Sequence, residues 1–182
     1  IYLIHGYTAN ASSNWFPSFK KEMDNENLTV CILEMPNSNA PKFNEWLEHL
    51  ENKIVDYSEN SIFIGHSLGC VSILNYLNTK QQKFKGLFLI SGFSEESPIV
   101  ELLDFIHTKI NYDLIQRLVE TRVSISAKDD DIIPFEYSER LAQKLNTQFI
   151  LLDEGKHFID RDGIYEFPKL VTEVKKLISK TN

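Results

Sequence analysis

Six short apolar runs recur along the chain, and they constrain its fold more than any other feature of the sequence. The stretches between most of these runs have helical periodicity. Strands that are almost continuously apolar are typical of a parallel sheet covered on both faces by crossover helices. The sequence therefore predicts a single α/β domain over residues 1–182, with a mostly parallel sheet of about six strands and helices on both faces. The expected strands are Ile1 to His5, Thr29 to Glu34, Ser61 to Gly65, Gly86 to Ser91, Arg122 to Ser126 and Gln148 to Leu152.

Three segments between or after these runs place apolar side chains on one face of a helix. They carry Phe43, Trp46, Leu47, Leu50 and Ile54, then Tyr137, Leu141 and Leu145 after Pro134, and finally Tyr165, Leu170, Val174, Leu177 and Ile178. The stretch from Phe93 to Glu120 is longer than one crossover needs, and its apolar residues suggest two pieces, 99–110 and 112–119. The sequence leaves two interpretations open here: a small lid over residues 93–112, or a helix packed on the sheet.

Composition and charge exclude several classes of protein. No apolar stretch is long enough to cross a bilayer, so we expect no membrane span. The formal net charge of -7 includes no block of Lys or Arg that could bind phosphates, so we expect no nucleic-acid partner. Cys31 and Cys70 have a spacing that fits no metal motif and lie in or beside apolar segments. We therefore expect reduced thiols, no metal and a cytoplasmic location.

The residues Gly65-His66-Ser67-Leu68-Gly69 lie between an apolar run and a helix-compatible run. This order of strand, sharp turn and helix is typical of a nucleophile elbow, in which glycines two positions either side of the serine let strand and helix approach. Five of the seven glycines follow expected strand ends, the edge where ligands collect in such sheets. These are Gly6, Gly65, Gly69, Gly92 and Gly155. The sequence thus predicts a reactive hydroxyl on Ser67 at that edge.

A serine needs a base, usually a histidine whose tautomer is fixed by a carboxylate. The fifth expected strand leads into Asp129-Asp130-Asp131, and the sixth leads into His157. The order Ser, Asp, His is that of the α/β-hydrolase architecture. We choose Asp130 because it lies four residues before Pro134, although Asp129 or Asp131 could act instead.

His157 is the only histidine that follows a late strand with a glycine nearby. His49 lies on the polar side of a helix, His107 lies in the possible lid, and the ring of His66 must point away from the Ser67 hydroxyl. The negative oxygen of a tetrahedral intermediate needs preorganised donors. We expect the backbone amides of Tyr7, in the loop after the first strand, and of Leu68, at the start of the elbow helix, to form this oxyanion hole.

The whole chain resembles the small serine hydrolases of the retinoblastoma-binding protein nine family, including its bacterial members. The resemblance is carried by Asn14-Trp15-Phe16-Pro17 with Lys20-Lys21-Glu22, Met35-Pro36-Asn37 with Pro41 and Trp46-Leu47, Gly65-His66-Ser67, Ile90-Ser91-Gly92-Phe93, Asp129-Asp130 with Pro134, and Gly155-Lys156-His157-Phe158. It implies a minimal α/β-hydrolase fold with at most a small lid, a triad of Ser67, Asp130 and His157, and hydrolysis of small esters or amides without a cofactor.

The sequence therefore predicts a cofactor-free serine hydrolase that acts on small carboxylic esters. An aminopeptidase-like or amidase activity is the nearest enzymatic alternative, and a non-catalytic binding module on the same fold is the alternative from another class. We expect His5, Phe93, Ile132 and Phe158 to line the substrate pocket.

Overall fold

The protein is built around a six-stranded sheet in which every neighbouring pair of strands is parallel. The computed structural model describes residues 1–25, 27–55 and 57–179. The strand order is β2-β1-β3-β4-β5-β6, so the chain reverses direction across the sheet after β2. The strands are β1 (Tyr2–Ile4), β2 (Cys31–Leu33), β3 (Ile62–His66), β4 (Phe84–Ile90), β5 (Val119–Ala127) and β6 (Gln148–Leu152).

All six predicted strands are present, which confirms the predicted fold class. Their bounds differ most at β5, which begins at Val119 rather than Arg122 because it pairs with β4 from Phe84 onward. β2 is shorter than predicted, since its register with β1 covers Cys31 to Leu33. The continuous apolar character of β3 and β4 is explained by burial of nearly all their residues.

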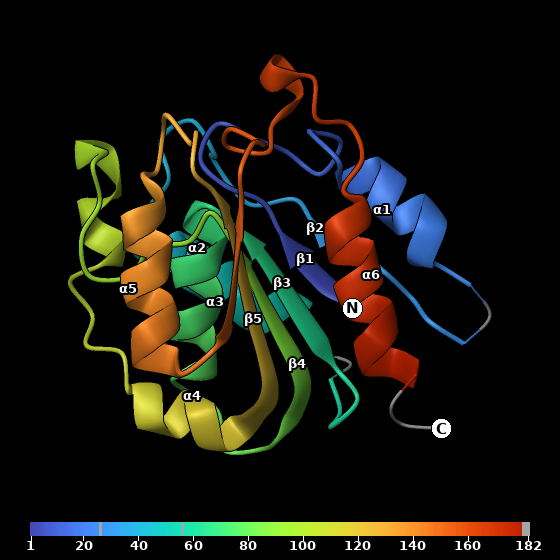
Figure 1. The fold of residues 1–182 in the computed structure, drawn as a ribbon. Coiled ribbons are helices and arrows are strands. Elements are labelled where there is room, and N and C mark those ends of the chain that lie inside the picture. Colours follow the sequence, from blue (N-terminus) through green and yellow to red (C-terminus); the bar gives the residue numbers. More distant parts are fainter. Residues whose placement is uncertain (26, 56, 180–182) are drawn as a thin grey trace.

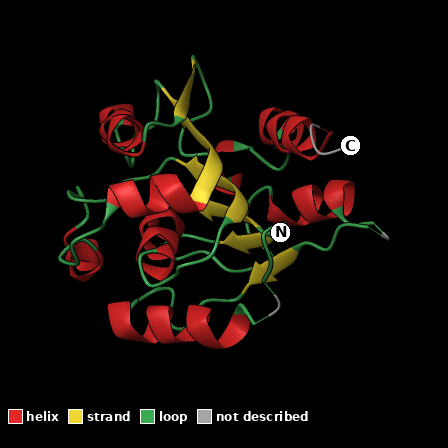
Figure 2. Cartoon of the chain, turned by 90° about the horizontal axis from the view of Figure 1, so that it is seen from below, coloured by secondary structure: helices red, strands yellow, loops and turns green. Residues whose placement is uncertain are grey.

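Helices cover both faces of the sheet (Figures 1 and 2). The α-helices are α1 (Phe16–Met23), α2 (Phe43–Lys53), α3 (Leu68–Leu77), α4 (Tyr112–Leu118), α5 (Phe135–Leu145) and α6 (Pro168–Ser179), with short 3-10 helices η1 (Val100–Phe105) and η2 (Asp160–Asp162). Side chains of α2, α3, η1, α4 and α5 form one core cluster. Side chains of α1 and α6 form the other, on the opposite face.

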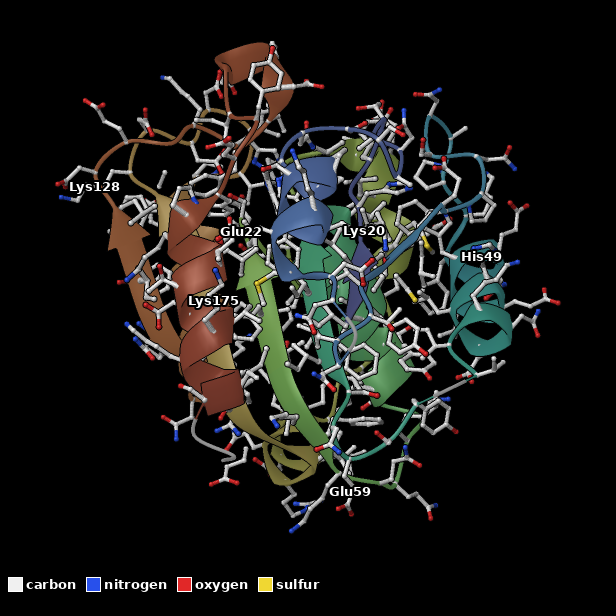
Figure 3. All side chains as sticks on the ribbon, turned by 90° about the vertical axis from the view of Figure 1, so that its right-hand side faces the viewer. Lys20, Glu22, His49, Glu59, Lys128 and Lys175 are labelled. Carbon is white, nitrogen blue, oxygen red and sulfur yellow. The ribbon has the colours of Figure 1, made fainter. Side chains whose placement is uncertain are left out.

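Helices α1 and α6 lie side by side on their face of the sheet. Glu22 of α1 accepts a hydrogen bond from Nζ of Lys175 of α6 at 2.8 Å, and Figure 3 shows both residues at this pair of helices. Exposed ion pairs of this kind stabilise a fold by about 1 kcal/mol or less, so the apolar cluster beneath holds the two helices. Within the described ranges, no helix has both the length and the apolar character needed to cross a membrane.

The stretch from 93 to 120 folds into the two pieces expected, η1 and α4. Leu102 and Phe105 of η1 are fully buried, and the ring of Phe105 meets the ring of Trp46 edge to face at 5.5 Å. This segment therefore packs on α2 rather than standing clear of the domain. The prediction for Tyr165 was wrong: it precedes α6 and is 62% exposed, because the helix begins at Pro168.

Candidate active site

Ser67 occupies a sharp turn between β3 and α3. Its backbone has φ 53° and ψ -119°, a conformation that residues with a side chain rarely adopt. A Cβ on Gly69 would lie 2.2 Å from the carbonyl oxygen of Ile4, and one on Gly65 would lie 2.8 Å from the backbone of Cys70. Glycine is therefore required at both positions, and the strained turn lifts Ser67 to the carboxyl edge of the sheet.

His157 lies against Asp130, although 27 residues separate them along the chain. Nδ1 of His157 is 2.9 Å from Oδ2 and 3.0 Å from Oδ1 of Asp130, and both side chains are buried. Oδ1 also accepts hydrogen bonds from the amides of Ile132 and Ile133, at 3.0 and 2.9 Å. Burial raises the pKa of Asp130, but the contact with His157 and the amide of Ile133 outweigh burial and hold this pKa below its ordinary value.

The two neighbouring aspartates have other partners. Oδ1 of Asp129 accepts the amide of Lys156 at 2.8 Å, and Asp131 pairs with the guanidinium of Arg161 at 3.4 Å. Of the three consecutive carboxylates, Asp130 is the one that the structure brings to His157. An ionised carboxylate can only accept, so Nδ1 of His157 carries the proton and Nε2 is left as a potential base.

Ser67 and His157 both border a cavity of about 380 Å³ at the carboxyl edge of the sheet. Its other lining residues come from the loop after β1, the end of β3, the residue before η1, the loop after β5 (the acid loop, with Asp129 to Asp131) and the segment around η2. They are Gly6, Tyr7, Thr8, Ala9, Ser13, Asn14, His66, Ile99, Ile132, Ile159, Asp160 and Arg161. A Cβ on Gly6 would lie 2.9 Å from Cβ of Ser67, so the loop after β1 lies directly on the serine. Leu68 is the first residue of α3, and amides in the first turn of a helix have no partner within that helix.

Ile132 borders the cavity, but the other three residues expected to line it lie in the interior. His5 is fully buried, where its Nδ1 donates to the carbonyl of Gly6 at 2.8 Å and its Nε2 accepts the amide of Met35 at 3.0 Å. Phe93 is buried in the core cluster to which α3 and α5 contribute. Phe158 has a left-handed backbone (φ 54°), and its ring turns inward to stack on Phe167 at 4.6 Å.

The segment that follows His157 was not predicted to border the site. Ile159, Asp160 and Arg161 border the cavity, and η2 stands at the upper end of the molecule in Figure 1. The amide of Asp160 donates to Oδ1 of Asn14 at 3.1 Å, which joins this segment to the loop after β1. In the sequence, the polar residues before Gly163 indicate only a turn. They do not reveal that the turn lies beside the cavity.

The contact made by His66 was not predicted either. Its ring turns toward the histidine loop, with Nε2 2.8 Å from the carbonyl oxygen of His157. Burial, with a smaller contribution from nearby His157, lowers the pKa of His66 to about 3. His66 is therefore neutral near pH 7. Among residues 1–25, 27–55 and 57–179, no three His, Cys, Asp or Glu side chains gather as a metal site would require.

The sequence matches a known family over nearly its whole length. The profile of the serine hydrolase family matches residues 1–176. The YdeN protein of Bacillus subtilis is 33% identical over 183 residues, covering 99% of this chain and 96% of YdeN. The serine hydrolase RBBP9 of Rattus norvegicus is 20% identical over 172 residues, covering 93% of this chain and 89% of RBBP9.

Solved structures show the same architecture. The crystal structure of the B. subtilis ydeN product has a TM-score of 0.93 at 32% identity, covering 98% of this chain and 97% of that one. Mouse alpha/beta hydrolase domain-containing protein 10 has a TM-score of 0.71 at 16% identity, covering 100% of this chain and 90% of the mouse chain. The second likeness concerns the fold alone. Together they confirm the predicted α/β-hydrolase fold.

Proposed function

Because the chain belongs to the serine hydrolase family, we propose that it cleaves small carboxylic esters through an acyl-enzyme formed on Ser67. The observation that carries this proposal is the buried pair of His157 and Asp130, in which His157 borders the same cavity as Ser67. A hydroxyl becomes a useful nucleophile near neutral pH when an oriented imidazole can take its proton.

In the proposed mechanism, Nε2 of His157 removes the Ser67 proton as Oγ bonds to the ester carbonyl carbon. The carbonyl oxygen becomes an oxyanion, and Asp130 stabilises the imidazolium that forms. The C–O bond to the alcohol then breaks, and the leaving alkoxide takes the proton from His157. Water repeats the sequence on the acyl-enzyme, releasing the carboxylic acid and restoring Ser67.

We assign the oxyanion hole to the amides of Tyr7 and Leu68. The loop at Gly6 lies against Ser67, and Leu68 begins α3, whose amino-terminal end carries partial positive charge. Loss of one such donor commonly slows acyl transfer by about a hundredfold. The cavity of about 380 Å³ suits a small substrate, and Ile99, Ile132 and Ile159 give it an apolar portion for an acyl group.

An aminopeptidase-like activity is a second candidate, and Asp160 is the residue that favours it. Asp160 borders the cavity and is exposed, and a carboxylate in this position could pair with the free amino group of an aminoacyl substrate. The two candidates share the same acyl-enzyme chemistry and differ in the bond that is cleaved.

A fluorophosphonate probe and a substrate panel test the proposal. We expect the purified protein to be labelled at Ser67, Ser67→Ala to remain unlabelled, and aryl esters of short acyl chains to be turned over faster than aminoacyl amides. The reverse preference would favour the second candidate. A folded protein that resists the probe, or is modified at another residue, would instead indicate a binding module without catalysis.

A further inference from the structure

One hydrogen bond joins the residue before the nucleophile to the residue that bears the base. Nε2 of His66 is 2.8 Å from the backbone oxygen of His157, across a separation of 91 residues. A carbonyl can only accept, so Nε2 of His66 carries the hydrogen and donates it. Both residues are at least 96% buried, which shields this bond from water.

The turn that presents His157 is held in a strained conformation. Lys156 and Phe158, on either side of it, have φ of 50° and 54°, and each such left-handed residue costs roughly 1 kcal/mol or more. Such a turn persists when its surroundings fix it. The amide of Lys156 donates a hydrogen bond to Oδ1 of Asp129, and the amide of Phe158 donates one to the carbonyl of Gly155. The hydrogen bond from His66 holds the backbone carbonyl of His157, which lies between these two amides.

Aromatic side chains enclose the ring of His66. The rings of Trp15 and Phe16 meet it edge to face, at 6.2 and 5.8 Å. Its Nδ1 is buried and has no hydrogen-bond partner among the described residues, which is consistent with a neutral ring whose single proton is on Nε2. The ring is therefore an uncharged donor with one fixed acceptor.

We propose that His66 is a positioning residue that sets the distance between Oγ of Ser67 and Nε2 of His157. This inference rests on the proposed function. His66 is bonded covalently to Ser67 and, through its side chain, to the backbone of His157, so nucleophile and base share one short connection. Displacement of a reacting group by about 1 Å can slow catalysis by about a hundredfold. His66 also borders the cavity, but the role proposed here is carried out through its hydrogen bond to the backbone of His157 and not through a reacting atom.

His66→Gln and His66→Met form a matched pair of variants. The amide nitrogen of glutamine lies the same number of bonds from Cα as Nε2 of histidine, whereas methionine has a similar length and no donor. The wild-type protein is first labelled with a fluorophosphonate and assayed with an aryl ester, and labelling at Ser67 together with turnover shows that the proposed function stands. The labelling rate, kcat and KM for an aryl ester, and the thermal midpoint are then measured for both variants.

We expect His66→Met to lose about tenfold to a hundredfold in labelling rate and kcat, with KM within about threefold of wild type. We expect His66→Gln to recover most of this loss. A residue that served folding alone would lower the thermal midpoint and leave kcat of the folded protein unchanged. Equal losses in the two variants, or full activity in His66→Met, would overturn the proposal.

A measurement on the unmodified protein keeps the test decisive if His66→Met does not fold. Nitrogen-15 NMR of labelled histidine should show a proton on Nε2 of His66 and none on Nδ1 across the pH range of activity. A proton on Nδ1 instead would overturn the proposal, and so would a folded His66→Gln variant with less than about a tenth of wild-type kcat.

Discussion

Asp130 meets the imidazole of His157 with both carboxylate oxygens, at 2.9 and 3.0 Å from Nδ1. The amides of Ile132 and Ile133 hold Oδ1 in place, so the orientation of the histidine depends on the backbone of the acid loop. Asp129 and Asp131 contact other partners, and this separation makes the role of each carboxylate testable.

We expect Asp130→Asn to lower kcat for an aryl ester by about a thousandfold or more, because an amide no longer fixes the productive tautomer of His157. Asp131→Asn is the matched control. Its carboxylate pairs with exposed Arg161, so this variant should keep at least about half of wild-type kcat. Comparable losses in the two variants would argue against the assignment of Asp130.

Gly69→Ala should destabilise the protein by about 3 kcal/mol, because the new Cβ would lie 2.2 Å from the carbonyl oxygen of Ile4. The free energy of unfolding, measured by urea titration, checks this expectation. Gly163→Ala serves as control: its Cβ would meet nothing within 4 Å, and its φ of +79° alone should cost about 1 kcal/mol. A Gly69→Ala variant as stable as Gly163→Ala would contradict the close packing of α3 on β1.

Stability should fall below pH 6.5 because of His66. Its pKa is about 3 in the folded protein and about 6.5 in an unfolded chain, so the unfolded state takes up the proton first as the pH falls. This contribution to stability is complete above pH 6.5 and is lost as the pH falls toward 3. Between pH 7 and pH 5 the loss should be about 2 kcal/mol. Urea titrations at pH 7 and pH 5 measure the free energy of unfolding of wild type and of His66→Gln. An equal pH dependence of this free energy in the two proteins would refute the expectation.

Anionic esters should be poorer substrates than neutral esters of the same size. The loops 128–131 and 153–162, which follow β5 and β6, carry seven carboxylates and three Lys or Arg side chains. We expect kcat/KM for a succinate half-ester to be lower by about threefold to tenfold at low salt, and the gap to narrow at about 0.5 M salt. Asp160→Asn should also reduce the difference in kcat/KM between the neutral and the anionic ester. Faster cleavage of the anionic ester would indicate that Arg161 dominates recognition.

The sequence predicted the sheet well because buried parallel strands leave a continuous apolar signal. β6 was predicted with its observed bounds, and the resemblance to the family of RBBP9 is confirmed by the match to the serine hydrolase family. The elbow was readable because Gly65 and Gly69 lie two positions either side of Ser67, a spacing visible in the sequence. The contact that requires Gly69 is with Ile4 of β1, far away in the chain, and only the structure shows it.

The cavity was less predictable because its lining depends on backbone turns that leave no periodic pattern. Phe158 was predicted to line the pocket, but its backbone is left-handed and its ring stacks on Phe167. His66 was expected to point away from the reacting hydroxyl, and nothing in the sequence indicated its carbonyl partner. Asp160 reaches the cavity through a contact with Asn14 that joins distant parts of the chain.

The hydrogen bond between Asn14 and the amide of Asp160 spans 146 positions of the chain. During synthesis, the loop after β1 therefore leaves the ribosome well before the segment around Asp160 that faces it. The two walls of the cavity can come together only after both segments have been made, so the cavity is a product of late, long-range folding.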